Sequence, residues 1–305
     1  MSGHFDIFVI GAGVAGMKAA EEAVRRKLKV AIAEEGMFGG LVMNVNHLQP
    51  GPNGMPNSGG ELAADMMTSV ADLGVETLMA PVTSVERDGS GMIRVATSDE
   101  THTTRSVIVA TGARLRKLGI AGEAEFEHRG VSSCADCDGP LFRNQTVVVI
   151  GGGDSAMQEA AVLTEYCSAV HVVHRGSAFS ARKEFVDAVL ANPRITVHFD
   201  TIAEAIEGDD AVQSVKLKNI KTGDVQTLPC TGVFAYVGLE PNTAFLSGKV
   251  ATDNGAIRVN EQMQSDLPDV FAIGAARAGY AGKLTDAIAD AERAVAAASE
   301  RLARA

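Results

Sequence analysis

Long apolar runs are absent from this chain of 305 residues: none reaches the roughly 18 residues that a membrane-spanning helix needs. The N-terminal residues pass directly into an apolar strand pattern, without the charged segment and cleavage site of a secretory signal. Basic residues are also few, 27 against 38 acidic ones, and the formal net charge of -11 disfavours nonspecific binding to nucleic acid or to anionic membranes. We therefore expect a cytoplasmic protein of about two domains, with neither nucleic-acid nor membrane partners.

Cysteine is scarce, and the four cysteines fall into two kinds. Cys167 and Cys230 stand alone in apolar segments, where a free cysteine usually behaves as a small buried hydrophobic residue. Cys134 and Cys137 form a Cys-x-x-Cys pair, and in a reducing compartment such a pair favours redox chemistry over a structural disulfide. A zinc site would need a second ligand pair, and His128 offers only one more donor nearby, so we expect no metal.

The sequence contains two copies of a strand, a glycine-rich turn and a helix. The first copy has a strand at 5–10, a turn at 11–16 and a helix at 17–27, and the second has a strand at 146–150, a turn at 151–156 and a helix to about 166. Further strands at 29–33 and 169–173 follow these helices, which indicates parallel strands joined by a helix. We therefore predict an α/β fold with two Rossmann-like nucleotide-binding units.

Outside these units, the alternating segments 81–109 and 203–233 predict a small antiparallel addition to each unit, and the stretch 284–305 predicts a helix.

The first glycine turn has the residues that a dinucleotide-binding turn needs. Its first glycine permits the tight bend, its second allows the backbone to approach a pyrophosphate, and its third lets the helix pack on the strand. Glu34, at the end of the following strand, is suited to accept hydrogen bonds from a ribose. A glycine turn alone can be an ordinary bend, but here strand, helix and acidic residue agree. The cofactor-binding residues predicted here are Gly11, Gly13, Val14, Ala15, Gly16 and Glu34.

The second glycine turn predicts a nicotinamide site. Its predicted contacts are Gly151, Gly153, Asp154, Ser155 and Ala156, the last in place of the third glycine. The strand that follows ends at His174 and Arg175 instead of a carboxylate, and Arg182 and Lys183 lie nearby. Cations at this place suit the 2'-phosphate of NADPH, which favours NADPH while leaving NADH possible. A solvated basic surface is the alternative interpretation.

Together these motifs resemble the low-molecular-weight thioredoxin reductase family, which are FAD-dependent pyridine nucleotide-disulfide oxidoreductases. The matching segments, in family order, are 11–16, Glu34 with Gly39-Gly40, 110–113, 134–139, 151–156 and 234–241. The resemblance implies two three-layer domains, the second inserted into the first: an FAD domain at 1–114 and 245–305, and an NAD(P)H domain at 115–244 that carries the cysteine pair. It also implies a homodimer and a rotation of the inserted domain about connections near 113–115 and 239–241.

The resemblance also implies roles for individual residues. Electrons would pass from NAD(P)H through FAD to the cysteine pair, with Cys137 facing the flavin and Cys134 attacking an external disulfide. Asp138 would protonate a leaving thiolate, although a turn-forming role is the local alternative. Further flavin contacts implied are Gly39, Gly40, Leu41, Ala110, Thr111, Gly112, Gly274, Ala275 and Thr285.

The chain departs from the family pattern in four respects. Two phosphate-binding arginines fall on Gly176 and Ser180, and Ala275 stands where the C-terminal flavin motif has an aspartate. The Arg-Gln pair expected near the flavin falls around Lys283-Leu284-Thr285. Asp136 replaces a neutral residue between the cysteines, and a carboxylate there is expected to raise a thiol pKa if it points inward.

The favoured function is an NAD(P)H-dependent reductase acting on a thioredoxin-like protein or a small disulfide. Two alternatives stay open at this point. A flavin-dependent dithiol oxidase that passes electrons to oxygen would suit the reduced set of phosphate-binding arginines. A flavin-binding protein without turnover would suit the altered C-terminal motif, but it leaves the cysteine pair unexplained.

Overall fold

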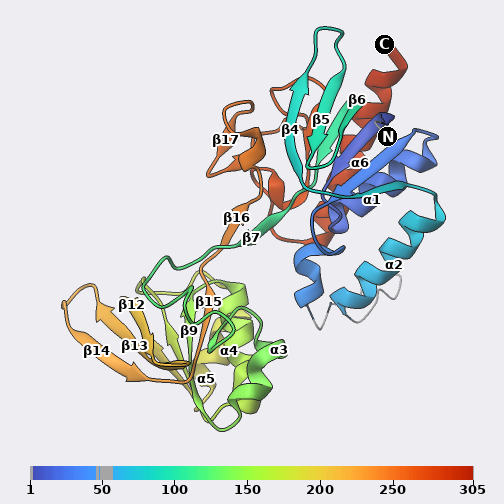
Figure 1. Ribbon diagram of the computed structural model, residues 1–305. Helices are drawn as coiled ribbons and strands as arrows, with labels where there is room; N and C mark the ends of the chain where they lie inside the picture. Colours follow the sequence, from blue (N-terminus) through green and yellow to red (C-terminus); the bar gives the residue numbers. More distant parts are fainter. Residues whose placement is uncertain (1–2, 46–47, 49–57, 305) are drawn as a thin grey trace. The chain divides into compact units, whose positions relative to one another are not determined.

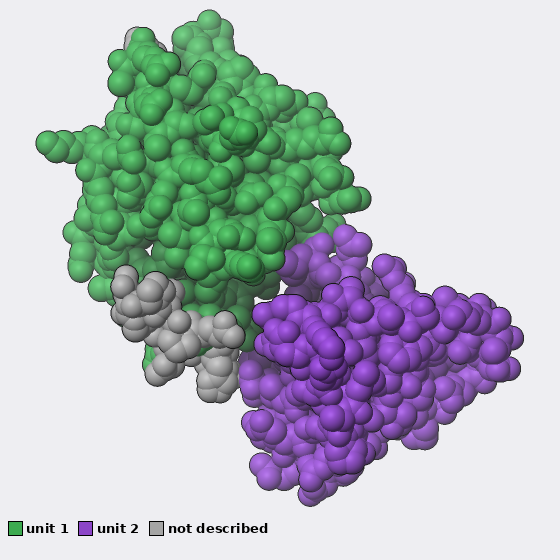
Figure 2. Space-filling view, turned by 180° about the vertical axis from the view of Figure 1, so that it is seen from behind, with its two compact units in different colours: residues 1–114, 240–305 green, residues 115–239 purple. Residues whose placement is uncertain are grey.

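The structure, a computed structural model, describes residues 3–45, 48 and 58–304. The chain forms two compact units, shown in green and purple in Figure 2: Met1–Arg114 with Glu240–Ala305 (unit 1), and Leu115–Leu239 (unit 2). The chain thus leaves unit 1 after Arg114 and returns to it at Glu240, whereas the expected return was at residue 245.

Two short strands carry the chain between the units. They are β7 (Ala113–Leu115) and β16 (Leu239–Pro241), which pair as a two-stranded sheet (Figure 1). On the unit 1 side, the guanidinium of Arg114 donates to the carboxylate of Glu240 at 2.9 Å. On the unit 2 side, the amide of Arg116 donates to the carbonyl of Gly238 at 3.0 Å.

Unit 1 is built on a seven-stranded sheet whose central strands are parallel. Its path runs β3-β2-β1-β6-β5-β4, and β19 also pairs with β6. The strands are β1 (His4–Ile10), β2 (Val30–Glu34), β3 (Glu76–Met79), β4 (Val82–Arg87), β5 (Ile93–Thr97), β6 (Thr101–Val109) and β19 (Val270–Ala272). Strands β1, β2, β3, β6 and β19 are parallel, and β4, β5 and β6 form the antiparallel extension.

Helices cover one face of this sheet. Alanines of α1 (Val14–Arg25) and α6 (Leu284–Arg304) pack with Ile7, Val9 and Ile32 of the sheet in one buried cluster. Phe5, Phe8 and Val107 face the other side, where they pack with residues of β4 and β5. The alternation of buried residues toward both faces explains why β1 has an almost continuous apolar sequence.

The remaining elements of unit 1 are α2 (Gly59–Asp72), the strand pair β17 (Thr252–Asp253) and β18 (Ala256–Ile257), and the 3-10 turns η1 (Gly40–Asn44), η3 (Ala244–Leu246) and η4 (Gly274–Ala276). A capping box begins α2: the hydroxyl of Ser58 accepts from the amide of Glu61, whose carboxylate accepts from the amide of Ser58.

Unit 2 repeats the plan of unit 1. Its five-stranded parallel sheet has the order β11-β10-β9-β15-β8, and a separate antiparallel sheet has the order β12-β13-β14. The strands are β8 (Val131–Ser132), β9 (Thr146–Gly151), β10 (Ala169–Val173), β11 (Ile195–His198), β12 (Thr201–Gly208), β13 (Val212–Asn219), β14 (Val225–Pro229) and β15 (Gly232–Tyr236). The helices are α3 (Ala135–Asp138), α4 (Asp154–Tyr166) and α5 (Lys183–Ala191), with the 3-10 turn η2 (Gly139–Phe142).

Two buried clusters make unit 2 a three-layer structure. Met157 and Leu163 of α4 pack with Val147 and Val149 on one face of the parallel sheet. On the other face, Val148 packs with residues of β12 and β13. The predicted α/β class with two Rossmann-like units is thus confirmed.

Several element boundaries differ from the sequence-based prediction. Helix α1 begins at Val14, inside the glycine turn, because the last residues of the motif form the first helical turn. Strand β6 pairs antiparallel with β5, as predicted, but it also pairs in parallel with β1, whereas β15 belongs to the parallel sheet of unit 2 instead of the predicted antiparallel addition. The C-terminal helix is confirmed as far as Arg304, and Ala305 lies outside the described residues. Among the helices described, none combines the length and apolar character needed to cross a bilayer.

Candidate functional site

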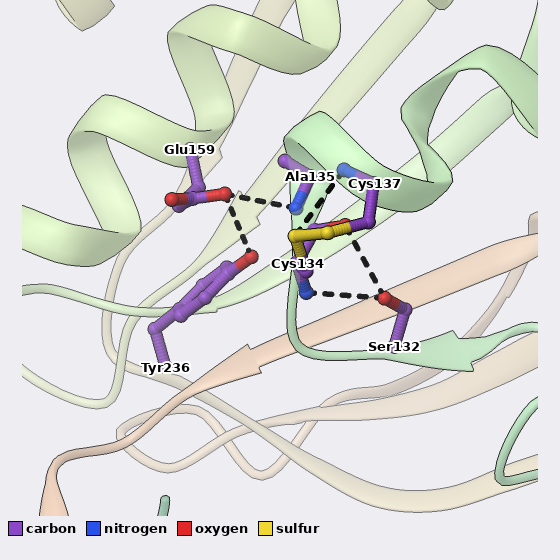
Figure 3. The surroundings of a disulfide bond; sticks show 6 residues. All are labelled: Ser132, Cys134, Ala135, Cys137, Glu159 and Tyr236. Atoms are coloured by element: carbon purple, nitrogen blue, oxygen red, sulfur yellow. Dashed lines mark hydrogen bonds between the residues drawn. A yellow bond between two sulfur atoms is a disulfide. The ribbon is translucent and has the colours of Figure 1, made fainter. Parts of the chain in front are cut away.

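Cys134 and Cys137 form a disulfide beside the carboxyl end of β8 (Figure 3). Cys134 lies at the N-cap of the short helix α3, and its Sγ accepts a hydrogen bond of 3.2 Å from the amide of Cys137. The hydroxyl of Ser132 accepts from the amide of Cys134 at 3.1 Å, which fixes the approach to the helix. Cys137 is exposed and Cys134 is half-buried, so both sulfurs belong to residues at the surface of unit 2.

A half-buried carboxyl stands beside this disulfide. Oε2 of Glu159, on α4, accepts from the amide of Ala135 at 2.9 Å and from the hydroxyl of Tyr236, on β15, at 3.1 Å (Figure 3). Burial raises the pKa of Glu159, and the nearby charge of Asp136 adds to this, while the two donors partly oppose it. Burial also raises the pKa of the Tyr236 hydroxyl, followed by the influence of Glu159. Tyr236 is therefore a neutral donor at physiological pH.

The two aspartates of α3 are placed differently from each other. Asp136 lies near the Glu159–Tyr236 pair and acts on both of their pKa values through its charge. The backbone amide of Asp138 donates to the carbonyl of Cys134 at 3.1 Å, which closes the single turn of α3. Both aspartate side chains are partly exposed.

The glycine turn of unit 2 leads from β9 into α4. Gly151 has a φ of +157°, and a Cβ on it would lie 2.4 Å from the carbonyl oxygen of Tyr236. Ala156 is fully buried against this turn, which explains why a small residue suffices at the third position of the motif. Gly153, by contrast, has no atom within 4 Å of a built Cβ, so its surface is open to a ligand at the start of α4.

Only part of the predicted cation cluster is available for a phosphate. Arg182 donates through its amide and its Nε to the two carboxylate oxygens of Asp154, each at 2.7 Å. These bonds, the backbone one first, lower the pKa of Asp154. Lys183 pairs with Asp187 at 2.5 Å. Among the described residues, no bond from Arg175 to another side chain is seen, and its side chain is exposed.

His174 has a structural position next to the same turn. Its Nε2 donates to the carbonyl of Ala178 at 2.9 Å, and its ring lies against Gly152, where a built Cβ would be 2.2 Å from Nδ1. The loop after β10 thus folds back over the turn, and the hydroxyl of Ser180 donates to the carbonyl of Gly152 at 3.1 Å.

The glycine turn of unit 1 leads from β1 into α1. Gly11 has a φ of +99°, and a Cβ on it would lie 2.5 Å from the carbonyl oxygen of Ala110. Gly16 is still more confined, with the carbonyl oxygen of Gly11 at 1.9 Å from a built Cβ. Around Gly13 the nearest atom is the carbonyl oxygen of Gly39 at 3.6 Å, so the middle of the turn has free space. This pattern matches the three glycine roles expected from the sequence.

Glu34 lies at the edge of the same turn, at the end of β2. Its carboxylate accepts from the amide of Ala12 at 2.7 Å and from the amide of Gly36 at 3.0 Å. A carboxylate has about four acceptor positions, so Glu34 retains capacity for hydroxyl donors. Val14 and Ala15 are buried in the first turn of α1, and Gly40 and Leu41 begin η1 with exposed surface.

The segment after β6 also reaches this edge of the sheet. Among the described residues, the buried Oγ1 of Thr111 has no hydrogen-bond partner, although a hydroxyl in such a place normally has one. The backbone of Thr111 and of Gly112 is held by Asn242, whose side chain donates to the carbonyl of Thr111 at 3.0 Å and whose amide donates to Gly112 at 3.1 Å. A bound ligand with a polar edge would satisfy the Thr111 hydroxyl.

The C-terminal motif joins the site through Gly274. A Cβ on Gly274 would lie 3.2 Å from Cβ of Ala15, so η4 touches the first turn of α1. Ala275 is half-buried and offers no side-chain hydrogen bond, as its side chain is a methyl group. Thr285 is exposed on the first turn of α6. The residue before it, Leu284, packs on the buried cluster that contains Val14.

A buried carboxylate from α6 supports this motif. Asp290 is fully buried and accepts from the amide of Gly274 at 3.2 Å and from Arg277 Nε at 2.6 Å. It also accepts from Arg293 at 3.1 Å. Asp290 thus supports the Gly274 backbone from α6.

The sequence analysis missed Glu159, Tyr236, Asn242 and Asp290. Each is far along the chain from the group it contacts, so no local motif reveals it. Tyr236 could have been found from the pairing of the strands. Parallel pairing of β15 with β9 places Tyr236 opposite Gly151, at the edge of the sheet where the residues of the glycine turn and of the disulfide lie. The two free cysteines are buried as predicted, and burial raises their pKa values, to about 11 for Cys167 and about 12 for Cys230.

Comparison with known proteins identifies relatives that match most of this chain. The thioredoxin reductase of Treponema pallidum is 38% identical over 279 residues, which cover 91% of this chain and 91% of that protein. The one from Listeria innocua is 38% identical over 288 residues, 94% of this chain and 90% of that protein.

Solved structures give the same result for the fold. The crystal structure of Lactococcus lactis thioredoxin reductase has a TM-score of 0.93 and 37% identity, covering 99% of this chain and 100% of the other. That of T. acidophilum thioredoxin reductase has a TM-score of 0.89 and 30% identity, covering 98% and 99%. The model of the pyridine nucleotide-disulphide oxidoreductase family matches residues 5–298. The chain therefore belongs to the pyridine nucleotide-disulphide oxidoreductases, and the resemblance predicted from its motifs is confirmed.

Proposed function

We propose that this enzyme reduces the disulfide of a thioredoxin-like protein, or a small disulfide, at the Cys134–Cys137 pair with electrons from NADPH. The observation that carries the proposal is the disulfide itself, which lies at the carboxyl edge of the unit 2 sheet with Cys137 exposed. Membership of the family implies FAD and NADPH as cofactors. The family name and the relatives support a disulfide reductase, whereas the identity of the disulfide partner is the part that we propose.

The residues of unit 1 fit an FAD molecule. The open space at Gly13 and the N-terminus of α1 suit its pyrophosphate, and the remaining acceptor positions of Glu34 suit its ribose. The unpartnered hydroxyl of Thr111 suits a polar edge of the ring system. We assign unit 1 as the FAD domain, with the further contacts Val14, Ala15, Gly39, Gly40, Leu41, Ala110, Gly112, Gly274, Ala275 and Thr285.

The residues of unit 2 fit a nicotinamide dinucleotide. The open space at Gly153 lies at the N-terminus of α4, with Ser155 exposed in the first helical turn. Arg175 is the candidate for the 2'-phosphate of NADPH, since Arg182 is held by Asp154 and Lys183 by Asp187. We assign unit 2 as the NADPH domain. The flavin, when bound, supplies the two-electron chemistry that links the nicotinamide to a disulfide.

The chain's own residues carry out the thiol–disulfide exchange. With both cysteines reduced, the thiolate of Cys134 attacks one sulfur of the external disulfide, forms a mixed disulfide and expels the other sulfur as a thiolate. Asp138 supplies a proton to that leaving thiolate. Cys137 then loses its thiol proton to solvent, and its thiolate attacks Sγ of Cys134. This attack restores the internal disulfide and releases the second sulfur of the partner as a thiolate, which takes up a proton from solvent.

We further propose a cytoplasmic homodimer, as the family resemblance implies. The short connections β7 and β16 are the positions at which unit 2 would turn relative to unit 1, since a rotation there needs changes in few residues.

An anaerobic titration tests the proposed function. Purified protein is titrated with NADPH and, separately, with NADH, while the flavin absorbance is followed, and thioredoxin is then added. Bleaching by NADPH and recovery of the absorbance with oxidised thioredoxin are expected. Bleaching by dithiols alone would favour the dithiol oxidase, and a flavin that neither reagent bleaches would favour binding without turnover. Colourless protein that cannot be reconstituted with FAD would contradict the proposal.

A further inference from the structure

Ala135 directly follows Cys134 in the chain, but its backbone amide donates its hydrogen bond to a group other than the Cys134 sulfur. Its hydrogen goes to Oε2 of Glu159 at 2.9 Å, and the same oxygen accepts from the hydroxyl of Tyr236 at 3.1 Å (Figure 3). The peptide that joins Cys134 to Ala135 is thus tied to a carboxyl on α4. Ala135 is fully buried and Glu159 is half-buried, so this bond is partly shielded from water.

This arrangement leaves few donors for the sulfur of Cys134. Amides that point at a cysteine sulfur favour its thiolate, and a nearby carboxylate disfavours it. Among the described residues, the one hydrogen bond to Cys134 Sγ comes from the amide of Cys137 at 3.2 Å. Glu159 therefore both withdraws the Ala135 amide and brings a carboxyl group close to the attacking sulfur.

We propose that Glu159, held in place by Tyr236, is a positioning residue that limits the formation of the Cys134 thiolate. The inference rests on the proposed role of Cys134 as the attacking cysteine. Through this effect, Glu159 controls the rate at which the reduced cysteine pair reacts with a disulfide at neutral pH. The step controlled is the loss of the Cys134 thiol proton to solvent, which precedes attack on the disulfide.

The ionisable groups around Glu159 are few. Tyr236 on β15 donates to it, and Asp136 on α3 raises its pKa through charge. Strand β9 and the turn η2 also pack on α4 and have no ionisable side chain. His171 of β10 lies on the other face of the sheet, because the alternating Val170 and Val172 face α4.

The charged groups of α5 and of α4 itself are engaged elsewhere or exposed. Lys183 pairs with Asp187, Glu184 with Arg182, and Arg182 with Asp154. Glu165, near the end of α4, is exposed. Partial burial raises the pKa of Glu159, which distinguishes it from these groups.

The test is the rate at which iodoacetamide alkylates Cys134. Reduced, FAD-loaded protein is freed of reductant under argon and treated with iodoacetamide from pH 5 to pH 10, and fragment-ion mass spectrometry separates Cys134 from Cys137. In Glu159→Gln the side chain still accepts from the Ala135 amide, but its charge is gone. We expect the Cys134 midpoint to fall by about 0.5 to 1 pH unit, which means alkylation about 3- to 10-fold faster at pH 7.

Two further variants make the result specific. Glu159→Asp keeps the charge and should alkylate at least about threefold more slowly than Glu159→Gln at pH 7. Glu165→Gln removes the same charge from an exposed position on the same helix and should change the rate by less than about twofold. Equal shifts in Glu159→Gln and Glu159→Asp, equal shifts in Glu159→Gln and Glu165→Gln, or no shift in Glu159→Gln would overturn the proposal.

The unsubstituted protein gives an independent measurement if a variant does not fold. A Cys134 midpoint above the ordinary thiol value of about 8.5 is expected, and a midpoint below about 7 would contradict the proposal. Alkylation requires neither NADPH nor a disulfide partner. Failure of the reductase assay would therefore leave this measurement valid, and the two failures can be told apart.

Discussion

At the scale of single residues, the ion pairs of unit 2 decide which cations can meet a phosphate. Arg182 makes two bonds of 2.7 Å to Asp154, whereas Arg175, which is exposed like Arg182, has no bonded side-chain partner among the described residues. A carboxylate at the guanidinium partly offsets its charge, so Arg182 attracts a second anion less strongly than a free arginine does. Sequence alone placed both arginines near the coenzyme and had no means to separate them.

Replacement of the two arginines should therefore have different effects on coenzyme use. Arg175→Ala should raise KM for NADPH about tenfold or more, through loss of a charge-assisted hydrogen bond, and leave KM for NADH nearly unchanged. Arg182→Ala should raise KM for NADPH by less than about threefold. Steady-state kinetics with both coenzymes checks this. A larger effect of Arg182→Ala on NADPH than of Arg175→Ala would show that the Asp154 pair opens when coenzyme binds.

The two buried cysteines should be inert beside the reactive pair. Burial raises the pKa of Cys167 to about 11 and that of Cys230 to about 12, so at pH 8 almost none of either is thiolate. Native protein reduced and then treated with iodoacetamide at pH 8 should take up label at Cys134 and Cys137 alone, and at all four cysteines after denaturation. Mass spectrometry of the labelled peptides measures this. Labelling of Cys230 in native protein would show that its segment opens locally.

Residues that belong to one sequence motif were predicted, whereas residues that are brought into contact only by the folding of the chain were missed. Gly13, Glu34 and the cysteine pair were found because spacing along the chain indicates their chemistry. Glu159 lies 24 residues from Ala135 and Tyr236 lies 77 residues from Glu159, so their bonds depend on the packing of α4 and β15. The same holds for Asp290, which supports Gly274 from 16 residues away.

At the scale of elements, each glycine turn has positions where the fold itself requires a glycine and positions where the neighbouring atoms leave space for a side chain or a ligand. Helix α1 can pack on β1 because Gly16 has no side chain: a Cβ there would lie 1.9 Å from the carbonyl oxygen of Gly11. Gly13 has extended backbone angles that any residue can adopt and a nearest neighbour at 3.6 Å. The described residues therefore leave room for a side chain at position 13, and the proposed pyrophosphate is what would require a glycine there.

Alanine at these two positions should separate folding from flavin binding. Gly16→Ala should destabilise the protein by about 2 to 4 kcal/mol, because α1 must shift away from the sheet. Gly13→Ala should change the free energy of unfolding of the apoprotein by no more than about 1 kcal/mol, while weakening FAD binding about tenfold or more. Urea unfolding of apoprotein and fluorescence titration with FAD provide the two measurements. Unchanged FAD affinity in Gly13→Ala would argue against a pyrophosphate at this turn.

Strands and helices next to the motifs were predictable, and the others were less so. The turns at 11 and 151 predicted β1, α1, β9 and α4 because apolar runs flank them on both sides. Helix α2 was missed although Ser58 and Glu61 form a capping box at its start. Strand β15 was placed in an antiparallel addition, and the parallel neighbour of β6 was missed, because alternation along a strand does not reveal the direction of its neighbours.

At the scale of the whole molecule, separate hydrophobic clusters within each unit account for the division of the chain. In unit 2 the clusters around Met157 and Val148 are composed of residues from 118 to 237, so its core is complete within Leu115–Leu239. The insertion is possible because β7 and β16 lie side by side: the chain leaves unit 1 and re-enters it at neighbouring points. The discontinuous FAD domain came from the family resemblance, since no feature of the local sequence marks where an insertion ends.

A unit with a complete core and adjacent ends should fold alone. The fragment 115–239 is expected to unfold in one cooperative thermal transition and to form the Cys134–Cys137 disulfide in air, because α3, α4 and β15, which hold the pair, all lie within it. Differential scanning calorimetry and thiol counting test both statements. The matched control is fragment 115–229, which lacks β15 and thus removes the strand that pairs with both β8 and β9, and it should not show a cooperative transition. The opposite outcome is a fragment 115–239 that unfolds non-cooperatively although the whole chain unfolds cooperatively. In that case the core of unit 2 must include residues outside it, and the two units would have to be treated as one folding domain.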